Sequence, residues 1–312
     1  MVDRMGDRPV AAASASALGP RGRGLFGRLL GGLRAQHSAR SEACSIAVAS
    51  GKGGTGKSFV STSLAVLLHR AGRRTTLVDC DFGLAADHLL LGVKPVNTLQ
   101  QLLTGKAPLK DVLIETPCGP RLLPGASGVR KLAAMSDRDM LHFARELGAV
   151  AADNDVVLMD VGAGISPSVL LTMLAADMIV LVTQPEIAAL VDAYAVVKCV
   201  AQLRADARFC VLVNRVQTPG RGEQAFKKLT EVSRQHVGIS LQYLGEVLDD
   251  PRVGQHRLGQ LPLVVTEPEA TTSAAMRAIA VRLEQIAGPL QRRSVEGEAG
   301  IEARFRRHRL FL

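Results

Sequence analysis

The sequence Gly-Lys-Gly-Gly-Thr-Gly-Lys-Ser occupies residues 51 to 58. It matches the phosphate-binding loop pattern, in which a glycine and four further residues precede Gly-Lys-Ser or Gly-Lys-Thr. A largely apolar segment, residues 45 to 49, comes before the loop, and residues 59 to 68 follow it with the apolar spacing of a helix. Strand, loop and helix are therefore in the order that the motif requires, and the sequence predicts a nucleotide-binding site.

Each residue type in this loop has a physical role. Glycines let successive backbone N–H groups point at phosphate oxygens, and the helix that begins near Lys57 adds the positive end of its dipole. We expect Lys57 to reach the β- and γ-phosphates and the Ser58 hydroxyl to ligate Mg²⁺. The loop residues expected to bind the nucleotide are Gly51, Lys52, Gly53, Gly54, Thr55, Gly56, Lys57 and Ser58.

Acidic residues end two of the predicted strands. Asp79 ends the segment 75 to 79 and Asp81 follows two residues later, while Asp160 ends the segment 156 to 160. The carboxyl ends of parallel strands meet at one edge of a sheet, which places these acids near the phosphate loop. We expect one acid of the first pair to serve the metal and the other the attacking water, and Asp160 to orient Mg²⁺ through its hydration shell.

Short apolar segments alternate with helical patterns through the central region. This alternation predicts an α/β fold with a doubly wound, mostly parallel sheet and helices on both faces. The predicted strands are residues 45–50, 75–79, 121–123, 156–160, 178–183, 209–213 and 241–248. The predicted helices are residues 57–70, 136–147, 188–203, 223–235 and 272–286. We expect one nucleotide-binding domain with this phosphate loop over residues 44–290.

The net charge of +9 is concentrated near the two ends of the chain. Residues 1–40 hold seven arginines against two acids, and residues 291–312 hold six arginines against three acids. Subtracting these thirteen bases and five acids from the totals of 38 and 29 leaves 25 bases against 24 acids. The globular part is therefore nearly neutral, and a broad DNA-binding face on it is not indicated.

Both ends are predicted to be flexible basic tails. In the tail of residues 1–43, the segment 24–35 has one broad apolar face, which suits an anchor on anionic lipid, a helix for a protein groove, or an inert disordered extension. In the tail of residues 291–312, Ile301, Phe305 and Leu312 share one side among arginines.

The composition fits a cytoplasmic protein. No apolar run reaches the roughly 18 residues that span a membrane, and the first residues lack the pattern of a secretory signal. The five cysteines are scattered without a Cys-x-x-Cys pair, which argues against disulfides and against an iron–sulfur or zinc site.

Three features together resemble one family, the MinD/ParA group of ATPases with a deviant Walker-A loop. They are Lys52 within the loop, the acids at the end of the second strand, and the sequence Asp-Val-Gly-Ala-Gly from Asp160. Residues 81–84, 162–166 and 182–186 are most similar to the flagellar-number regulators of this family, FlhG and FleN. The resemblance covers residues 44 to 287 and implies a Mg²⁺-dependent ATPase that converts ATP slowly to ADP and phosphate.

The resemblance also implies roles for single residues. Two ATP-loaded monomers pack face to face, and Lys52 of each reaches the phosphates held by the other. Asp81 positions the attacking water, while Ser58, Asp79 and Asp160 support the magnesium. Asn214 stands where relatives contact adenine, and a cap at the end of its strand is the alternative for this residue.

As a biological role, the resemblance implies control of flagellar number or placement, or a similar positioning role in cell polarity, through protein partners. It also implies reversible association with the inner face of the cell membrane, and the tail of residues 291–312 resembles the C-terminal amphipathic membrane-targeting helix of MinD-type relatives. Many flagellar members carry an Asp-Gln-Ala segment that stimulates the GTPase FlhF. Residues 1–43 lack it, which leaves that partnership open. A ParA-like DNA partition ATPase is the alternative, and a metal-cluster carrier or reductase on the same scaffold is disfavoured by the missing Cys-x-x-Cys.

Overall fold

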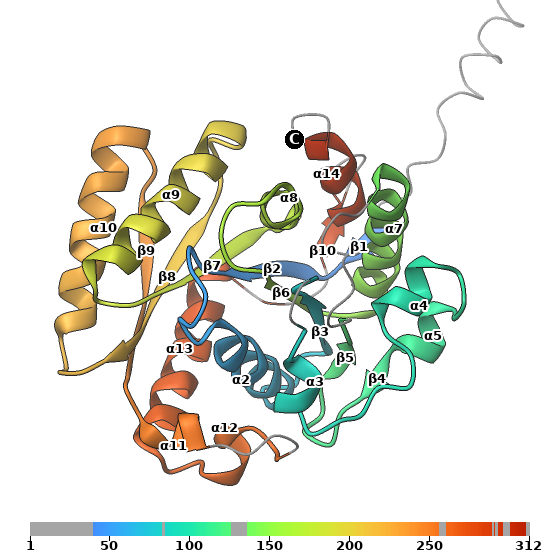
Figure 1. Cartoon of the computed structure of the whole chain (residues 1–312), viewed down its shortest axis with the longest axis horizontal. Helices are drawn as coiled ribbons and strands as arrows, with labels where there is room; N and C mark the ends of the chain where they lie inside the picture. Colours follow the sequence, from blue (N-terminus) through green and yellow to red (C-terminus); the bar gives the residue numbers. More distant parts are fainter. Residues whose placement is uncertain are drawn as a thin grey trace, which may run out of the picture. The chain divides into compact units, whose positions relative to one another are not determined.

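The computed structural model describes residues 40–82, 85–125, 136–255, 260–288, 290, 293–295 and 300–309. Residues 39–312 form one compact unit. The predicted amphipathic segment at residues 24–35 lies outside the described residues. The unit is built on a central sheet with helices on both faces, as the sequence predicted (Figure 1).

The central sheet has eight strands in the order β4-β5-β3-β6-β2-β7-β8-β9. Its pairings are parallel except for the antiparallel pair of β4 with β5 at one edge. The strands are β2 (Cys44–Ala49), β3 (Thr75–Cys80), β4 (Ile114–Glu115), β5 (Arg121–Leu123), β6 (Val156–Val161), β7 (Met178–Thr183), β8 (Phe209–Val216) and β9 (Leu241–Leu248).

Helices cover both faces because the strands present apolar side chains in both directions. One face packs against α2 (Lys57–Arg70), α12 (Leu263–Thr266) and α13 (Thr271–Ala287). The other packs against α4 (Leu99–Leu103), α5 (Leu109–Val112), α7 (Asp137–Asp153), α8 (Pro167–Ala175), α9 (Ile187–Leu203), α10 (Arg221–Val237) and α14 (Ile301–His308). Two short helices, α3 (Asp87–Leu90) and α11 (Pro251–Gln255), follow the carboxyl ends of β3 and β9.

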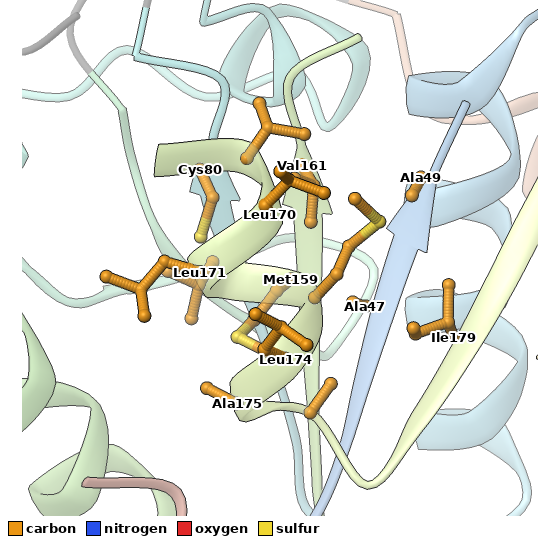
Figure 2. Close-up of a cluster of buried hydrophobic side chains, with 14 of the residues drawn as sticks. Ala47, Ala49, Cys80, Met159, Val161, Leu170, Leu171, Leu174, Ala175 and Ile179 are labelled. Carbon is orange, nitrogen blue, oxygen red and sulfur yellow. The ribbon is translucent and has the colours of Figure 1, made fainter. Parts of the chain in front are cut away.

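The side chains of β2 show how a buried strand serves two faces. Ala47 and Ala49 point into the core on the side of α8, whereas Ile46 and Val48 belong to the core on the side of α2. Figure 2 shows α8 lying over the strands, with Leu170 next to Val161 of β6 and with Ala47 and Ala49 on the neighbouring strand β2. The alanines leave room for this helix to approach the sheet closely.

The structure confirms each predicted strand and helix, with bounds that shift by a few residues. Helix α8 is an element that the sequence analysis missed. Seven of its nine residues, from Val169 to Ala175, are buried. A helix that is apolar on nearly every side has no amphipathic stripe, so its periodicity gives no signal.

The unit extends beyond the predicted bounds of residues 44 and 290. Strand β1 (Arg40–Glu42) lies in the predicted N-terminal tail and pairs antiparallel with β10 (Arg293–Val295) from the predicted C-terminal tail. The sequence shows no signal for this pairing because both strands have three residues, too few to establish an alternating pattern.

The predicted apolar side of the C-terminal tail is found on α14, where other helices of the same compact unit cover it. Ile301 and Phe305 are each 1% exposed, and the Phe305 ring meets Phe143 of α7 edge to face at 5.7 Å. Arg304 forms an ion pair of 2.9 Å with Asp177. Leu312, the third member of the predicted side, lies outside the described residues.

Phe305→Ala is expected to release α14 from the unit. Removing a buried phenylalanine costs about 3 kcal/mol or more in a fixed core, so undocking becomes the cheaper response for a terminal helix. Limited proteolysis should then cut the chain between residues 290 and 309 faster than in the parent protein. Arg306→Ala is the matched control, because Arg306 is exposed and its ion pair among the described residues is with Glu302 in the same helix. Equal proteolysis rates for the two variants would contradict the docking role of Phe305.

Candidate nucleotide site

The predicted phosphate loop runs from the carboxyl end of β2 to the start of α2. Gly54 and Gly56 have φ angles of +78° and +86°, a left-handed conformation that favours glycine. Helix α2 begins without a side-chain cap and without an acidic residue in its first turn. Its first N–H groups and the positive end of its dipole are thus not capped by a side chain of the helix itself, which fits a bound phosphate.

Three side chains hold the loop by its backbone carbonyls. The Ser50 hydroxyl donates to the carbonyl of Lys52 at 3.0 Å. Gln184, after β7, donates to Gly54 at 3.2 Å, and Asn214, near the end of β8, donates to Thr55 at 2.8 Å. These contacts turn the carbonyls toward the protein and preorganise the loop.

Asp160 is the centre of the buried polar network. Its carboxylate lies 2.9 Å from the Lys57 ammonium and accepts hydrogen bonds from Ser58 at 2.6 Å and Ser61 at 2.8 Å. Burial alone would lower the pKa of Lys57, but the Asp160 carboxylate outweighs it and the pKa is raised. The lysine therefore stays charged inside the protein, as a phosphate-binding group must.

Asp79 lies beside Asp160 because β3 and β6 pair in parallel with these two residues in register. Its carboxylate accepts hydrogen bonds from the N–H groups of Asp81 at 3.2 Å and Asp87 at 3.3 Å. Burial and the Asp160 charge raise the pKa of Asp79 to about 7. A cation beside it would favour the ionised form.

Asp81 lies just past the end of β3, beside the glycine segment that follows β6. A Cβ added at Gly162 would lie 3.7 Å from the Asp81 carboxylate. The two acids of the predicted pair therefore lie in different environments. Asp79 is buried beside Asp160, whereas Asp81 is partly exposed at the edge of the site.

Asp87 is a residue of this site that the sequence analysis missed. It is fully buried at the start of α3, where no N–H or O–H donor of the described residues reaches its carboxylate oxygens and the Asp160 carboxylate is a hydrogen-bonding neighbour. Burial, followed by the charges of Asp160 and Asp79, raises its pKa well above the usual range. The available signal was an acid in the first turn of a short helical segment eight residues after Asp79, a pattern that also suits a helix N-terminus on the surface.

These residues fit a magnesium ion held together with a nucleotide. Within the described residues, no group of three or more His, Cys, Asp or Glu side chains could hold a metal by itself. Mg²⁺ commonly takes only one or two protein carboxylates and fills its remaining positions with phosphate oxygens and water. Ser58 and Asp160 are in contact, with Asp79 and Asp87 nearby, and this arrangement suits such a shared site.

A pocket of about 500 Å³ opens beside the loop, next to the other predicted groups. Gly56, Phe59, Asn214 and Arg215 are among its lining residues. Asn214 therefore lies between the pocket and the loop, where its amide already holds Thr55. Lys52 is partly exposed, and the described residues offer its ammonium no hydrogen bond or ion pair.

Proteins similar to this chain carry the same kind of domain. The antiactivator FleN of Pseudomonas aeruginosa is 35% identical over 239 residues, 77% of this chain and 85% of that protein. The flagellum site-determining protein YlxH of Helicobacter pylori is 35% identical over 204 residues, 65% of this chain and 68% of that protein. The cell division ATPase MinD of Pyrococcus furiosus superposes with a TM-score of 0.67 at 28% identity, covering 78% of this chain and 99% of that chain.

The description of the matching family agrees with the geometry of the site. The CobQ/CobB/MinD/ParA nucleotide binding domain matches residues 46–263, which include the phosphate loop, both acidic strand ends and Asn214. The resemblance and the fold predicted from the sequence are thereby confirmed. The chain belongs to the CobQ/CobB/MinD/ParA family of nucleotide-binding proteins and, within it, is an ATPase of the MinD/ParA group with ATP and Mg²⁺ as cofactors.

Proposed function

We propose that this chain is an ATP-dependent dimerisation switch that controls flagellar number or placement through protein partners. The similarity to FleN and to YlxH, whose names refer to an antiactivator and to flagellum site determination, supports the flagellar role. The similarity to MinD supports a switch of the same architecture. Slow hydrolysis would limit the lifetime of the ATP-bound dimer.

In this proposal the residues of the site divide the work. ATP supplies the phosphoryl group and Mg²⁺ neutralises charge on its oxygens. Lys57 and the N–H groups of the loop hold the phosphates, while Ser58, Asp79 and Asp160 hold the metal and its water. Asp81, at the edge of the site, orients the attacking water. The base occupies the pocket lined by Asn214.

An exposed apolar patch around the phosphate loop is the main support for the proposed dimer. It is made of Ile165, Ile187 and Val191. These side chains are 45%, 79% and 59% exposed. Both ends of this patch lie next to the phosphate loop. Ile165 follows Gly164, whose N–H donates to the carbonyl of Ser50 at 2.9 Å. Val191 precedes Asp192, whose backbone packs against Gly51. Large apolar groups gathered at a charged site favour burial against a second protein surface.

Lys52 lies in the same loop and suits a contact across that dimer. Its partly exposed ammonium is not used by the described residues. In a water-poor interface one added positive charge would interact more strongly with phosphates than it would in bulk water.

Lys52→Ala is expected to bind ATP yet remain monomeric, because the lysine acts on the nucleotide of the opposite subunit. Light scattering with ATP, in an Asp81→Ala background that slows hydrolysis, measures the dimer, and a fluorescent ATP analogue measures binding. Lys228→Ala on α10 is the matched control, since Lys228 is exposed and its helix contributes no residue to the apolar patch. An ATP-dependent dimer of the Lys52 variant would overturn the crossing lysine.

We further propose a cytoplasmic protein that associates reversibly with the inner face of the membrane. No described helix is both long enough and apolar enough to cross a bilayer, so the contact we propose is peripheral. Because Ile301 and Phe305 are buried, lipid binding through α14 would require this helix to undock. Segment 24–35 is the second candidate anchor.

Co-sedimentation of the Asp81→Ala protein with anionic liposomes and with plasmid DNA, each with ATP or ADP, tests this association. Liposome binding only with ATP supports the membrane switch, and deletion of residues 300–312 or 24–35 identifies the anchor. ATP-dependent binding to DNA alone would replace the proposal by a ParA-like partition role.

A further inference from the structure

A second pocket lies at the opposite edge of the sheet from the phosphate loop. It has a volume of about 440 Å³ and is lined by the segments before β7 and before β8 and by α14. The phosphate loop follows the carboxyl end of β2, whereas this pocket borders the amino ends of the parallel strands β7 and β8. The nucleotide site therefore makes no use of it.

Basic groups dominate the lining of this second pocket. Four guanidinium groups line it against two carboxylates, Asp177 and Asp206, an excess of two positive charges. Asp177 is engaged by Arg304 at 2.9 Å and by the N–H and hydroxyl of Ser45 at 2.8 and 2.7 Å. The four basic residues, which we call the arginine pocket, are Arg204, Arg208, Arg304 and Arg307.

Two buried nitrogen atoms of the pocket have no hydrogen-bond partner among the described residues. They are Nε of Arg204 and Nδ1 of His308. His308 is only 7% exposed and lines the pocket. Nη1 of Arg204 donates hydrogen bonds to the carbonyls of Leu174 at 2.7 Å and Ala176 at 2.6 Å, and these bonds hold the guanidinium in place. Nε of Arg204 is a donor, and Nδ1 of His308 is a donor when it carries the ring proton. Buried donors without a partner in a positive pocket are costly unless an anion joins them.

The pKa shifts of His308 and Arg204 also indicate an excess of positive charge around the pocket. Burial, followed by Arg204, Arg307 and Arg304, lowers the pKa of His308. Burial and Arg304 lower the pKa of Arg204, with Asp206 and Asp177 opposing. A bound anion would relieve this repulsion.

We propose that the arginine pocket binds a phosphate-type anion that bridges α14 to the loop between α9 and β8 and so stabilises the docked position of α14. Guanidinium groups suit tetrahedral oxyanions because their planar N–H forks bind two oxygens at once. Arg304, Arg307 and His308 come from the helix, and Arg204 and Arg208 come from the loop. An anion that binds only the complete pocket must favour docking, since a ligand shifts an equilibrium toward the state that binds it.

A histidine-resolved NMR titration with inorganic phosphate tests the site. The full-length protein is saturated with Mg-ADP to occupy the phosphate loop, and chloride keeps the ionic strength constant. The resonance that disappears in His308→Gln identifies His308. We expect this resonance to shift in a saturable way, and Arg307→Gln to weaken phosphate binding about tenfold, because a charge-assisted hydrogen bond is lost.

Arg306→Gln is the matched control on the same helix, because Arg306 pairs with Glu302 and does not line the pocket. Its phosphate affinity should equal that of the parent protein. If Arg307→Gln unfolds, Arg208→Gln from the loop side replaces it. Equal weakening by the Arg306 change, or no saturable shift of His308 with phosphate or with vesicles, would overturn the proposal.

A second arm distinguishes a soluble phosphate from a lipid headgroup. Vesicles of phosphatidylglycerol and phosphatidylcholine are compared with vesicles of phosphatidylcholine alone. Phosphate binding with no vesicle effect supports a soluble ligand, and a His308 response only to the phosphatidylglycerol vesicles supports a headgroup. Phe305→Ala tests whether phosphate binding depends on the docked position of α14. This variant should lose phosphate binding together with docking. If α14 undocks and the phosphate affinity is retained, the anion does not bridge α14 to the loop.

Discussion

Asp160→Ala is expected to lower the free energy of unfolding by about 3 kcal/mol and to abolish ATP binding. The change leaves the buried Lys57 ammonium without its nearest counter-charge and the Ser58 and Ser61 hydroxyls without their acceptor. Asp87 and Asp81 also favour the charged form of Lys57, which limits the loss of folding free energy. Urea denaturation measures the stability, and a fluorescent ATP analogue measures binding.

The double variant Lys57→Met with Asp160→Ala separates stability from function. It removes both buried charges together, so it should regain most of the stability lost by the single change while still failing to bind ATP. If the double variant is as unstable as the sum of the two single variants, the two residues act independently and the charge-pair explanation is wrong.

Asp81→Ala is expected to keep ATP binding and to slow hydrolysis by about 100-fold or more, the scale at which a positioned acid–base group contributes. The partly exposed Asp81 lies beside Gly162, so its loss removes a group at the edge of the site without opening the buried network. The dimer should therefore persist with ATP. Phosphate release and light scattering measure the two effects.

Asp111→Ala is the matched control for this prediction, because Asp111 is an exposed acid on α5. Its hydrolysis rate should equal that of the parent protein. If Asp81→Ala loses ATP affinity in proportion to its rate, Asp81 serves binding and its assignment to the water is wrong.

The sequence was sufficient for the parts of this protein that depend on local chemistry. The loop from Gly51 to Ser58 is contiguous, so its spacing alone predicts the glycine conformations and the helix that starts at Lys57. The strand ends at Asp79 and Asp160 were predictable because buried parallel strands are short, apolar and followed by polar residues. The alternation of these segments then predicted the fold class.

Contacts between residues far apart in the chain could be found only in the tertiary structure. Asp87 joins the site because α3 folds back over the acidic strand ends. The side of α14 that carries Ile301 and Phe305 was visible in the sequence, but the surface that covers it was not. Periodicity shows that a side chain seeks burial, and only packing shows against what. The arginine pocket likewise exists because docking of α14 brings its basic groups beside Arg204, which lies about one hundred residues earlier in the chain.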